Sequence, residues 1–497
     1  MRSYVVFFLL VAMTGLFVVL QVTREPALHQ ATVAPAAGTG TGTGIVTPRV
    51  KGKAKKGSRP ASDKKPAPKP LPPLMKRPLR VASLGWELIA PGVVANGGAT
   101  PGKKSLFKKA RLDVHLAAFK SMEELEAALA RGGGDPLGAD VAILSLPELV
   151  AAHERIRALD PQVFLVLGWS RGRDGLMVAA NTSLTKLPRG RLDLIGQRGS
   201  SPTFFSLFVL ELAGVPASRV RLIEMEDKRA KKALFAALER PLPAGVAAGD
   251  RKFLATTADA GRLVPVVAVA PNGMIKSNTE ALVTWGQVWL AGVERLHADV
   301  PAAAREVAAL KSAPHALDLL KRLGQIDAAP LIDNARLAGL SGRDPVALNG
   351  LFRHCWHIWR TVGVLSSPMP EPPPIHTGIM AAMVRTYPAM VEAEPPRPRT
   401  PAATRQEAAG TGTLSTLLVH RLGARRWERQ ALVGPTGFIA AVFGQAQVKV
   451  SVRDSIQRAR ELVADITARY DISTPGRLHP ARHAGDGLVR VEIQIPQ

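Results

Sequence analysis

The 497-residue sequence has a single cysteine, Cys355, and aromatic side chains make up only 5% of its residues. One thiol excludes an intramolecular disulfide and any metal site built from several cysteines. His354 and His357 stand beside that cysteine, but no matching ligand pair occurs elsewhere, and Trp356 with Trp359 indicates the buried face of a helix. Paired carboxylates and an activated nucleophile at a recognisable spacing are missing as well. We therefore expect no metal, no cofactor and no catalytic residue.

One stretch does match a serine hydrolase motif. Residues 168–172 read GWSRG, which is the pattern of a nucleophile elbow. That chemistry requires a helix directly after the serine, so that its hydroxyl stands at the top of a sheet. Here residues 173–175 form a turn that leads into an apolar run at 176–180. The sequence therefore predicts two strands joined by a turn at this point and not a hydrolase.

Negative charge is scarce, since 40 acidic residues stand against 65 basic ones and the formal net charge is +25. Residues 49–80 hold twelve Lys or Arg residues and one acidic residue, Asp63, in a Pro- and Gly-rich tract typical of a disordered arm. The remaining excess is spread thinly, without the interleaved basic and aromatic residues of a nucleic-acid surface. We expect no nucleic-acid partner; an arm that lies against an anionic membrane or cell wall fits better.

The long hydrophobic run of this chain lies at its N-terminus. Residues 4–22 are almost wholly apolar, with Arg2 before them and Arg24 after them. The run is long enough to span a membrane as a helix and longer than most signal-peptide cores. We expect an uncleaved, single-pass anchor in the inner membrane, with residues 1–3 cytoplasmic and the bulk of the chain periplasmic; a cleaved signal peptide is the alternative. Residues 23–78 are predicted to be a disordered linker.

From residue 79 onward, short apolar runs alternate with helical patterns, which predicts an α/β fold with largely parallel sheets. Helical patterns are expected at 121–131 and 228–238, while the Gly- and Pro-rich segment 88–105 predicts a first helix that is short or absent. Strands are expected at 79–83, 112–118, 141–144, 163–168, 176–180 and 220–224. Helices dominate from about 279 to 390, a Pro-rich linker follows at 391–413, and a small α/β unit occupies 414–497.

The stretch 192–213 combines an apolar run, Gly199-Ser200-Ser201, Pro202 and then an apolar helical pattern. Serine before a helix and proline in its first turn are typical of a helix start. The free N–H groups, the hydroxyls and the positive end of the helix dipole together form a seat for a small anion. The alternative is an ordinary capped helix without a ligand.

Taken together, residues 79–390 resemble the solute-binding proteins of ABC transporters, in particular the nitrate/sulfonate/taurine and thiamine-precursor type. The segments that carry the resemblance are RVASLGW (80–86), VAILSLP (141–147), RDGLMV (173–178), GSSPTFF (199–205) and LATTADAGRLV (254–264). The resemblance implies a two-lobe periplasmic-binding-protein-like fold, with a second lobe at about 179–262. It further implies a small anionic or zwitterionic ligand between the lobes and an ABC permease or a sensor as partner. The family's ligand loops fall on Ser83, Trp86, Ser145, Ser200, Ser201, Thr203, Thr256, Thr257 and Asp259.

Each of these residues also has a structural alternative. Ser83, Ser145 and Thr256 suit turns, Trp86 suits a core, and Asp259 is within reach of an ion pair with Arg262. The whole chain has a second interpretation too, as an envelope structural or interaction protein that keeps this fold without a ligand.

The C-terminal unit resembles a degenerate OmpA-like peptidoglycan-binding domain. The residues that carry this resemblance are SIQRA at 455–459 and RVEI at 490–493. Such domains hold the diaminopimelate of the wall peptide with an acid and an arginine, and by that pattern Asp454 and Arg458 are the candidates. The family's loop between the acid and the helix is missing here. A structural appendage that does not bind the wall is therefore the alternative.

Overall fold

The computed structural model describes residues 71–179, 182–184, 187, 190–239, 251–392, 414–422, 427–444, 446–470, 472 and 477–496. The predicted anchor at 4–22, most of the predicted linker at 23–78 and most of that at 391–413 lie outside the described residues. Within the described part of the chain, no helix combines the length and apolar character needed to cross a bilayer. The last residues before the first strand pack on the fold, since Arg77 forms an ion pair with Asp140 at 2.6 Å.

The first lobe is built on a six-stranded sheet. Its strands run in the order β11-β4-β10-β3-β1-β2. β1 is parallel to β2 and β3, whereas β10 is antiparallel to β3 and β4, and β11 is antiparallel to β4. The strand bounds are β1 Leu79–Leu84, β2 Val114–Phe119, β3 Val141–Ser145, β4 Pro161–Ser170, β10 Pro265–Pro271 and β11 Ile326–Ala328.

The second lobe is built on a five-stranded sheet with the order β7-β6-β8-β5-β9. Here β6 is parallel to β7 and β8, while β5 is antiparallel to β8 and β9. The strand bounds are β5 Asp174–Ala179, β6 Leu192–Ile195, β7 Val220–Ile223, β8 Phe235–Glu239 and β9 Arg251–Thr256. The chain enters this sheet directly from β4 and returns from β9 to β10, so the two sheets are joined by two neighbouring crossings. Strand β10 returns from the second lobe without a crossover helix and pairs antiparallel with β3 and β4. Both sheets therefore contain parallel and antiparallel pairs, and the prediction of largely parallel sheets was wrong.

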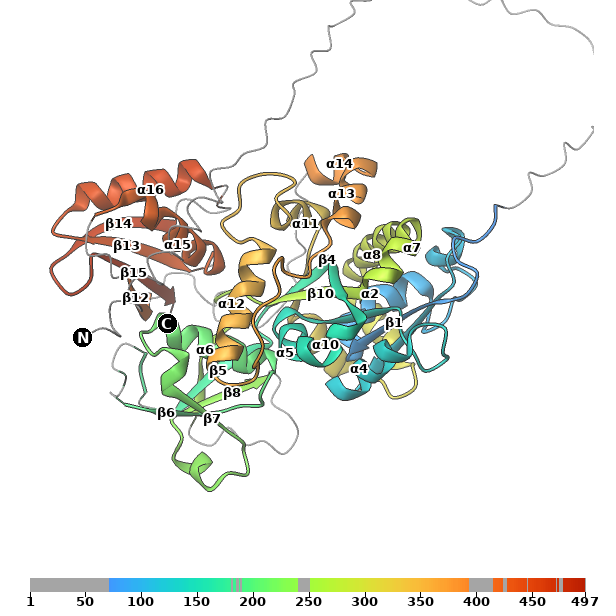
Figure 1. Cartoon of the computed structure of the whole chain (residues 1–497), viewed down its shortest axis with the longest axis horizontal. Coiled ribbons are helices and arrows are strands. Elements are labelled where there is room, and N and C mark those ends of the chain that lie inside the picture. Colours follow the sequence, from blue (N-terminus) through green and yellow to red (C-terminus); the bar gives the residue numbers. More distant parts are fainter. Residues whose placement is uncertain are drawn as a thin grey trace, which may run out of the picture. The chain divides into compact units, whose positions relative to one another are not determined.

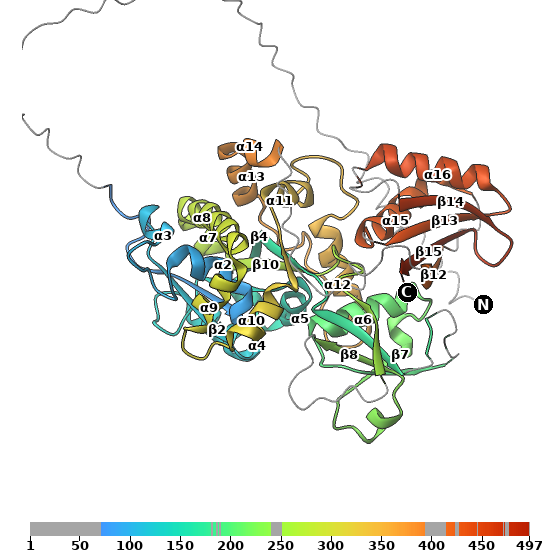
Figure 2. The ribbon, with the colours of Figure 1, turned by 180° about the vertical axis from the view of Figure 1, so that it is seen from behind.

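Helices cover the first sheet and connect the lobes (Figures 1 and 2). Their bounds are α2 Trp86–Asn96, α3 Leu106–Lys109, α4 Met122–Arg131, α5 Leu146–Ile156, α7 Asn272–Ser277, α8 Thr279–Ala298, α9 Val300–Ala308, α10 Ala316–Leu323, α11 Leu331–Leu337, α13 Thr377–Thr386 and α14 Ala389–Glu392. In the second lobe, α6 spans Ser201–Leu212, and α12, which spans Leu348–Thr361, packs on both α5 and α6.

Two further sequence expectations were wrong. The first helix is present, as the eleven-residue α2. It is rich in small residues because it lies close to α8, where a Cβ on Gly292 would come within 2.3 Å of the Pro91 carbonyl oxygen. The expected helix at 228–238 is instead a 3₁₀ turn at Lys228–Lys232 followed by strand β8. Its apolar end pairs with β6 on one side and β5 on the other, and that sheet context overrides the helical pattern.

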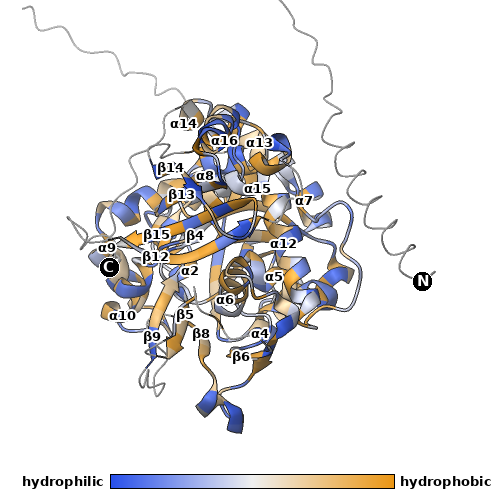
Figure 3. Cartoon of the chain, turned by 90° about the vertical axis from the view of Figure 1, so that its left-hand side faces the viewer, coloured by the Kyte–Doolittle hydropathy of each residue, from blue (hydrophilic) through white to orange (hydrophobic). Residues whose placement is uncertain are grey.

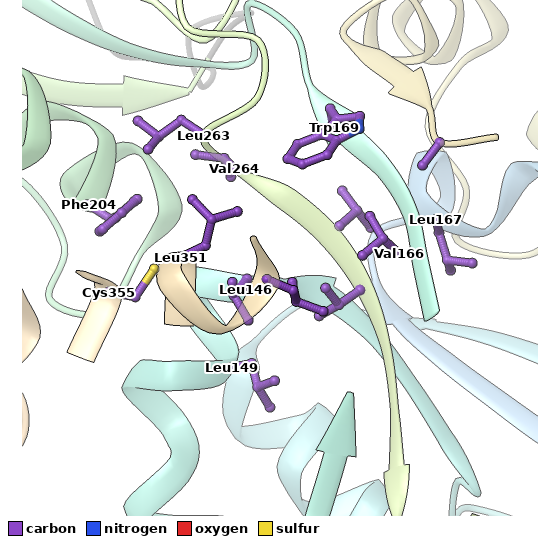
Figure 4. Close-up of a cluster of buried hydrophobic side chains, with 14 of the residues drawn as sticks. Leu146, Leu149, Val166, Leu167, Trp169, Phe204, Leu263, Val264, Leu351 and Cys355 are labelled. Carbon is purple, nitrogen blue, oxygen red and sulfur yellow. The ribbon is translucent and has the colours of Figure 1, made fainter. Parts of the chain in front are cut away.

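The joint between the lobes is a continuous apolar core (Figure 4). Leu146 at the start of α5, Phe204 of α6, Val264 just before β10 and Cys355 of α12 are all at most 1% exposed. The predicted buried face around Cys355 is thus confirmed. The Trp359 indole donates a hydrogen bond to the Pro147 carbonyl oxygen of the first lobe at 2.9 Å.

The C-terminal unit is a separate four-stranded sheet with the order β12-β15-β13-β14. Its elements are β12 Leu414–Leu422, α15 Arg429–Val442, β13 Gln447–Arg453, α16 Ile456–Arg469, β14 Leu478–His483 and β15 Val489–Pro496. Helix α16 packs on β13 and β14 and against α15, and in Figure 3 hydrophilic colours gather on α16. This unit contacts α6 of the second lobe through Phe438, whose ring meets that of Phe208, and through a His420 side chain 3.1 Å from the Leu212 carbonyl oxygen. The predicted α/β class, with two lobes and a small C-terminal α/β domain, is confirmed.

Candidate functional site

A cavity of about 810 Å³ opens between the two lobes. The first lobe lines it with the start of α2 after β1, the segment after β2 and the start of α5. The second lobe contributes Arg173, residues 197–200 before α6, and Glu239 at the end of β8. Strand ends and helix starts are the places where open α/β sheets bind ligands. This cavity is therefore the candidate site.

The start of α2 is held in an unusual backbone conformation. Gly85 has a φ of +103°, which favours glycine, and its carbonyl oxygen accepts a hydrogen bond from the buried Ser83 hydroxyl at 2.7 Å. The Glu87 side chain folds back onto this turn, since a Cβ on Gly85 would lie 2.7 Å from its Oε1. Trp86 lines the cavity and is 9% exposed. The Glu87 carboxylate therefore lies at the N-terminus of α2.

The start of α5 carries a second carboxylate. The Ser145 hydroxyl accepts a hydrogen bond from the Glu148 N–H at 3.3 Å, and the Glu148 Oε2 accepts one from the Ser145 N–H at 3.1 Å. This reciprocal arrangement is a capping box. Removal from water raises the pKa of Glu148 to about 7, while the nearby Arg173 guanidinium opposes that rise. Close to neutral pH, Glu148 therefore changes its protonation state.

Arg173 is the central cation of the cavity. Its guanidinium lies 3.4 Å from a carboxylate oxygen of Glu87 and 3.4 Å from one of Glu239. Arg322 reaches the same Glu87 carboxylate at 3.6 Å. Burial alone lowers the pKa of Arg173, but the surrounding carboxylates of Glu239 and Glu87 outweigh that effect and raise it. Arg173 is a permanent cation whose charge is already shared between two acids.

The start of α6, the stretch that predicted an anion seat, reaches the cavity with Gly199 and Ser200. The Ser200 hydroxyl lies 2.9 Å from the Gln197 carbonyl oxygen and 3.0 Å from the Thr203 hydroxyl. Ser201 and Thr203 are buried at 4% and 0% exposure and are not part of the cavity lining. The start of α6 therefore lines the cavity with its N-cap residue, Ser200, and with Gly199 before it.

The two crossings between the lobes are tied together by hydroxyl groups. The Thr257 hydroxyl accepts a hydrogen bond from the Gly172 N–H at 2.9 Å and lies 2.8 Å from the Ser170 hydroxyl. Ser170, the serine of the hydrolase-like motif, donates to the Asp174 carboxylate at 2.5 Å. Burial raises the pKa of Asp174 to about 6, and the charge of Glu239 adds to the rise. The charge of Arg173 and the hydrogen bond from Ser170 oppose it. Ser170 thus belongs to the two crossings between the lobes.

After β9, the turn is stabilised by its own side chains. The Asp259 carboxylate accepts a hydrogen bond from the Thr256 N–H at 2.8 Å. Arg262, which the sequence offered as an ion-pair partner of Asp259, forms an ion pair with Asp344 at 2.6 Å and lies over the Trp169 ring. Thr256, Thr257 and Asp259 therefore hold the second crossing.

The structure brings part of the predicted set together. Trp86 and Ser200 line the cavity, whereas Ser83 and Ser145 support the helix starts that do so. Ser201, Thr203, Thr256, Thr257 and Asp259 do not line it, and a ligand role for each of the nine stays a prediction. Sequence reasoning missed the charged residues that line the cavity, which are Glu87, Lys120, Glu123, Glu148, Arg155, Arg173, Arg198, Glu239 and Arg322. Only Glu148 had a visible signal, as the third residue after the cap Ser145.

In the C-terminal unit, the two candidate wall-binding residues have different surroundings. Asp454 has a φ of +57°, and its N–H donates to the His483 carbonyl oxygen at 3.0 Å. The Arg458 guanidinium lies 5.4 Å from the centre of the Trp427 ring. A ligand carboxylate would therefore meet an arginine already stacked on an aromatic face.

Comparison with known proteins gives neighbours in structure only. No protein-family model matches the sequence, and no curated protein matches it. Several periplasmic binding proteins of ABC import systems resemble the chain at low identity. The aliphatic sulphonate-binding protein SsuA from Escherichia coli is 16% identical over 51% of this chain and 80% of its own, with a TM-score of 0.38. The nitrate-binding protein NrtA from Synechocystis PCC 6803 is 12% identical over 64% and 89%, with a TM-score of 0.41. The ligand-binding component of an ABC-type import system from Staphylococcus aureus, solved with zinc bound, is 12% identical over 62% and 100%, with a TM-score of 0.43.

Proposed function

We propose that this protein is an extracytoplasmic solute-binding protein, which captures a small molecule between its two lobes and presents it to an ABC transporter or a sensor. The observation that carries the proposal is the cavity of about 810 Å³, lined from both lobes by strand ends and helix starts. Two crossings, tied to each other at Thr257, are the place where the lobes turn relative to one another. Within this proposal the chain is of the nitrate/sulfonate/taurine or thiamine-precursor type, and residues 4–22 tether it to the inner membrane.

A binding protein is stabilised by its ligand, because the ligand binds the folded state and not the unfolded chain. We expect the melting temperature of the full chain to rise with concentration for at least one member of a broad panel of small metabolites. At a hundredfold excess over Kd the gain is about 2.7 kcal/mol. Ser200→Ala and Trp86→Ala alter the cavity lining and should reduce the shift. A panel that leaves the melting temperature unchanged throughout contradicts the proposal.

A second candidate is an envelope interaction protein that uses the fold as a scaffold. Two observations favour it: α12 packs on helices of both lobes, and the C-terminal unit docks on α6. The packing of α12 limits the relative motion of the lobes, and the C-terminal unit covers part of α6 in the second lobe. In this reading, the C-terminal unit is an OmpA-like domain that binds peptidoglycan through Asp454 and Arg458.

Co-sedimentation with purified cell wall tests this second function. Arg458→Ala should abolish sedimentation. Arg469→Ala is the matched control, since Arg469 lies on the same helix and is also stacked on an aromatic ring, that of Tyr470. Equal sedimentation of the wild type and both variants would assign wall binding to another surface, and no sedimentation at all would remove this candidate.

A further inference from the structure

The sheet of the C-terminal unit presents two arginines on the face opposite to its helix. Helix α16 packs on β13 and β14, and the residues of β15 on that side, such as Val489 and Val491, are buried. The residues between them point to the other face, because side chains alternate along a strand. There Arg490 of β15 lies directly opposite Arg421 of β12. Arg421 is exposed and Arg490 is partly exposed, and we call the two the arginine pair.

The turn before β15 holds both side chains in place. A Cβ on Gly485 would lie 2.2 Å from the Arg490 Nη2, so this guanidinium rests against the main chain of the turn. The Arg490 Nε also donates a hydrogen bond to the Asp486 carbonyl oxygen at 3.2 Å. Gly487, with a φ of +87°, brings the main chain close to Arg421, because a Cβ added there would lie 3.5 Å from the Arg421 Cβ. The two arginines are therefore fixed side by side by the backbone.

No carboxylate of the described residues lies within ion-pair distance of either guanidinium of the arginine pair. Glu492, the next residue of β15 on the same face, is engaged by Lys449 at 3.4 Å. Asp454, after β13, and Asp486, in the turn, are exposed acids at the border of this face, and neither reaches the pair. Like charges directly opposite each other on two strands destabilise a sheet. The arginine pair is therefore unfavourable until an anion neutralises it.

The groups beside the arginine pair are donors or neutral. Ser451 of β13 lies opposite Arg490, is 0% exposed, and its hydroxyl has no hydrogen-bond partner among the described residues. Removal from water and the charge of Arg490 lower the pKa of His483, which the neighbouring carboxylates oppose in part. The His483 ring thus lies close to the pair without adding an acid to it. What this set of groups lacks is a hydrogen-bond acceptor with negative charge.

We propose that the arginine pair binds a phosphate monoester, whose phosphate group lies between the guanidinium groups of Arg421 and Arg490. This site is separate from the cavity between the lobes and goes beyond the proposed function. Each guanidinium carries one permanent charge and presents its N–H donors as a planar fork. A phosphate monoester matches the two forks with a charge of about −1.5 to −2 at pH 7 and three acceptor oxygens. A carboxylate offers only one charge and two oxygens.

The charge of such a ligand makes binding depend on pH. The second pKa of a phosphate monoester is about 6, so its dianion is the minor form at pH 5 and the major form at pH 7. Both arginines stay ionised across this range. Affinity for the monoester should therefore rise up to about tenfold from pH 5 to pH 7. Sulfate is a dianion throughout and should bind equally at both pH values, which controls for titration of His483, Asp454 and Glu492.

Calorimetry with the full chain tests the site, with methyl phosphate, dimethyl phosphate, acetate and sulfate as probes. We expect methyl phosphate to bind at pH 7 at least about tenfold more tightly than the diester and the carboxylate. Arg421→Gln and Arg490→Gln should each weaken it at least about tenfold, because each leaves a single guanidinium. Arg460→Gln is the matched control, since Arg460 is an exposed arginine on α16 of the same unit, and should bind like the wild type. Equal melting temperatures of the variants confirm that they fold.

Dihexanoyl phosphatidate, a soluble lipid with the same phosphate monoester, distinguishes the source of the ligand. Tighter binding than that of methyl phosphate assigns the site to a lipid headgroup, and equal binding assigns it to a soluble ester; both results support the site. Three results overturn the inference: no binding of methyl phosphate, equal binding of the diester, or unchanged binding in both arginine variants. None of the three affects the proposed solute-binding function, which is tested by the metabolite panel.

Discussion

Glu148 offers the sharpest test of the cavity's electrostatics, because its protonation is coupled to folding. Its pKa is raised from 4.5 to about 7 in the folded chain, chiefly by removal from water. A carboxyl with a raised pKa holds its proton more tightly in the folded than in the unfolded state. Its contribution is therefore most favourable below pH 4.5 and is lost as the pH rises from 4.5 through about 7. The direction is opposite to that of a salt-bridged surface acid.

The size of the effect follows from the shift. One pKa unit corresponds to 1.36 kcal/mol, so a rise from 4.5 to about 7 means that holding Glu148 ionised above pH 7 costs about 3 kcal/mol of folding free energy. Glutamine at this position has no charge and still accepts the hydrogen bond from the Ser145 N–H. Glu148→Gln should thus be within about 1 kcal/mol of wild-type stability at pH 5 and more stable by about 3 kcal/mol at pH 8.

Urea unfolding of both proteins at pH 5, 6, 7 and 8, followed by tryptophan fluorescence, measures this difference. The other titratable groups contribute almost equally to the free energy of unfolding of both proteins, so their contributions largely cancel in the difference. Glu280→Gln, at an exposed position, should show a difference that stays flat across the range. A flat difference for Glu148→Gln as well would refute the claim that removal from water raises the pKa of this carboxyl.

Three further substitutions test the packing described above. Thr257→Val leaves a backbone N–H and a serine hydroxyl of the first crossing without their partner and should lower the free energy of unfolding by about 1–3 kcal/mol, while Thr257→Ser should restore most of it. Asp344→Ala removes the 2%-exposed partner of Arg262 and should cost about 3 kcal/mol in urea unfolding; a cost below a few tenths would show that the pair is effectively solvated. Gly292→Ala forces a Cβ to within 2.3 Å of a carbonyl oxygen of α2 and should lower the melting temperature, whereas Gly273→Ala, with open space around it, should not; equal effects would contradict the close packing of α2 on α8.

The architecture was predictable because its strands are strongly apolar. Runs such as 141–144 and 163–168 are uniformly buried, and they ended up in the centre of the first sheet. The two errors about helices came from composition. Glycine and proline in α2 serve close packing against α8, and the apolar end of 228–238 belongs to a sheet whose neighbours are distant in sequence.

The site was predictable only in part, for a related reason. Serines and a tryptophan at strand ends are visible in a sequence, and Trp86 and Ser200 do line the cavity. The charges that set its electrostatics come from segments far apart: Glu87 on α2, Arg173 before β5, and Glu239 at the end of β8. No local pattern links such residues, since only the folding of two sheets against each other brings them to one place.

The position of β10 has a consequence for how the protein is made. This strand fills the gap between β3 and β4 at the middle of the first sheet, yet it follows the whole second sheet in the chain. During synthesis, the edges of β3 and β4 that pair with β10 therefore stay unpaired until β10 itself has left the ribosome, after the whole second sheet. Exposed strand edges of this kind pair readily with other chains. The first lobe to be translated is the later one to be completed, and chaperones have the longest time to act on it.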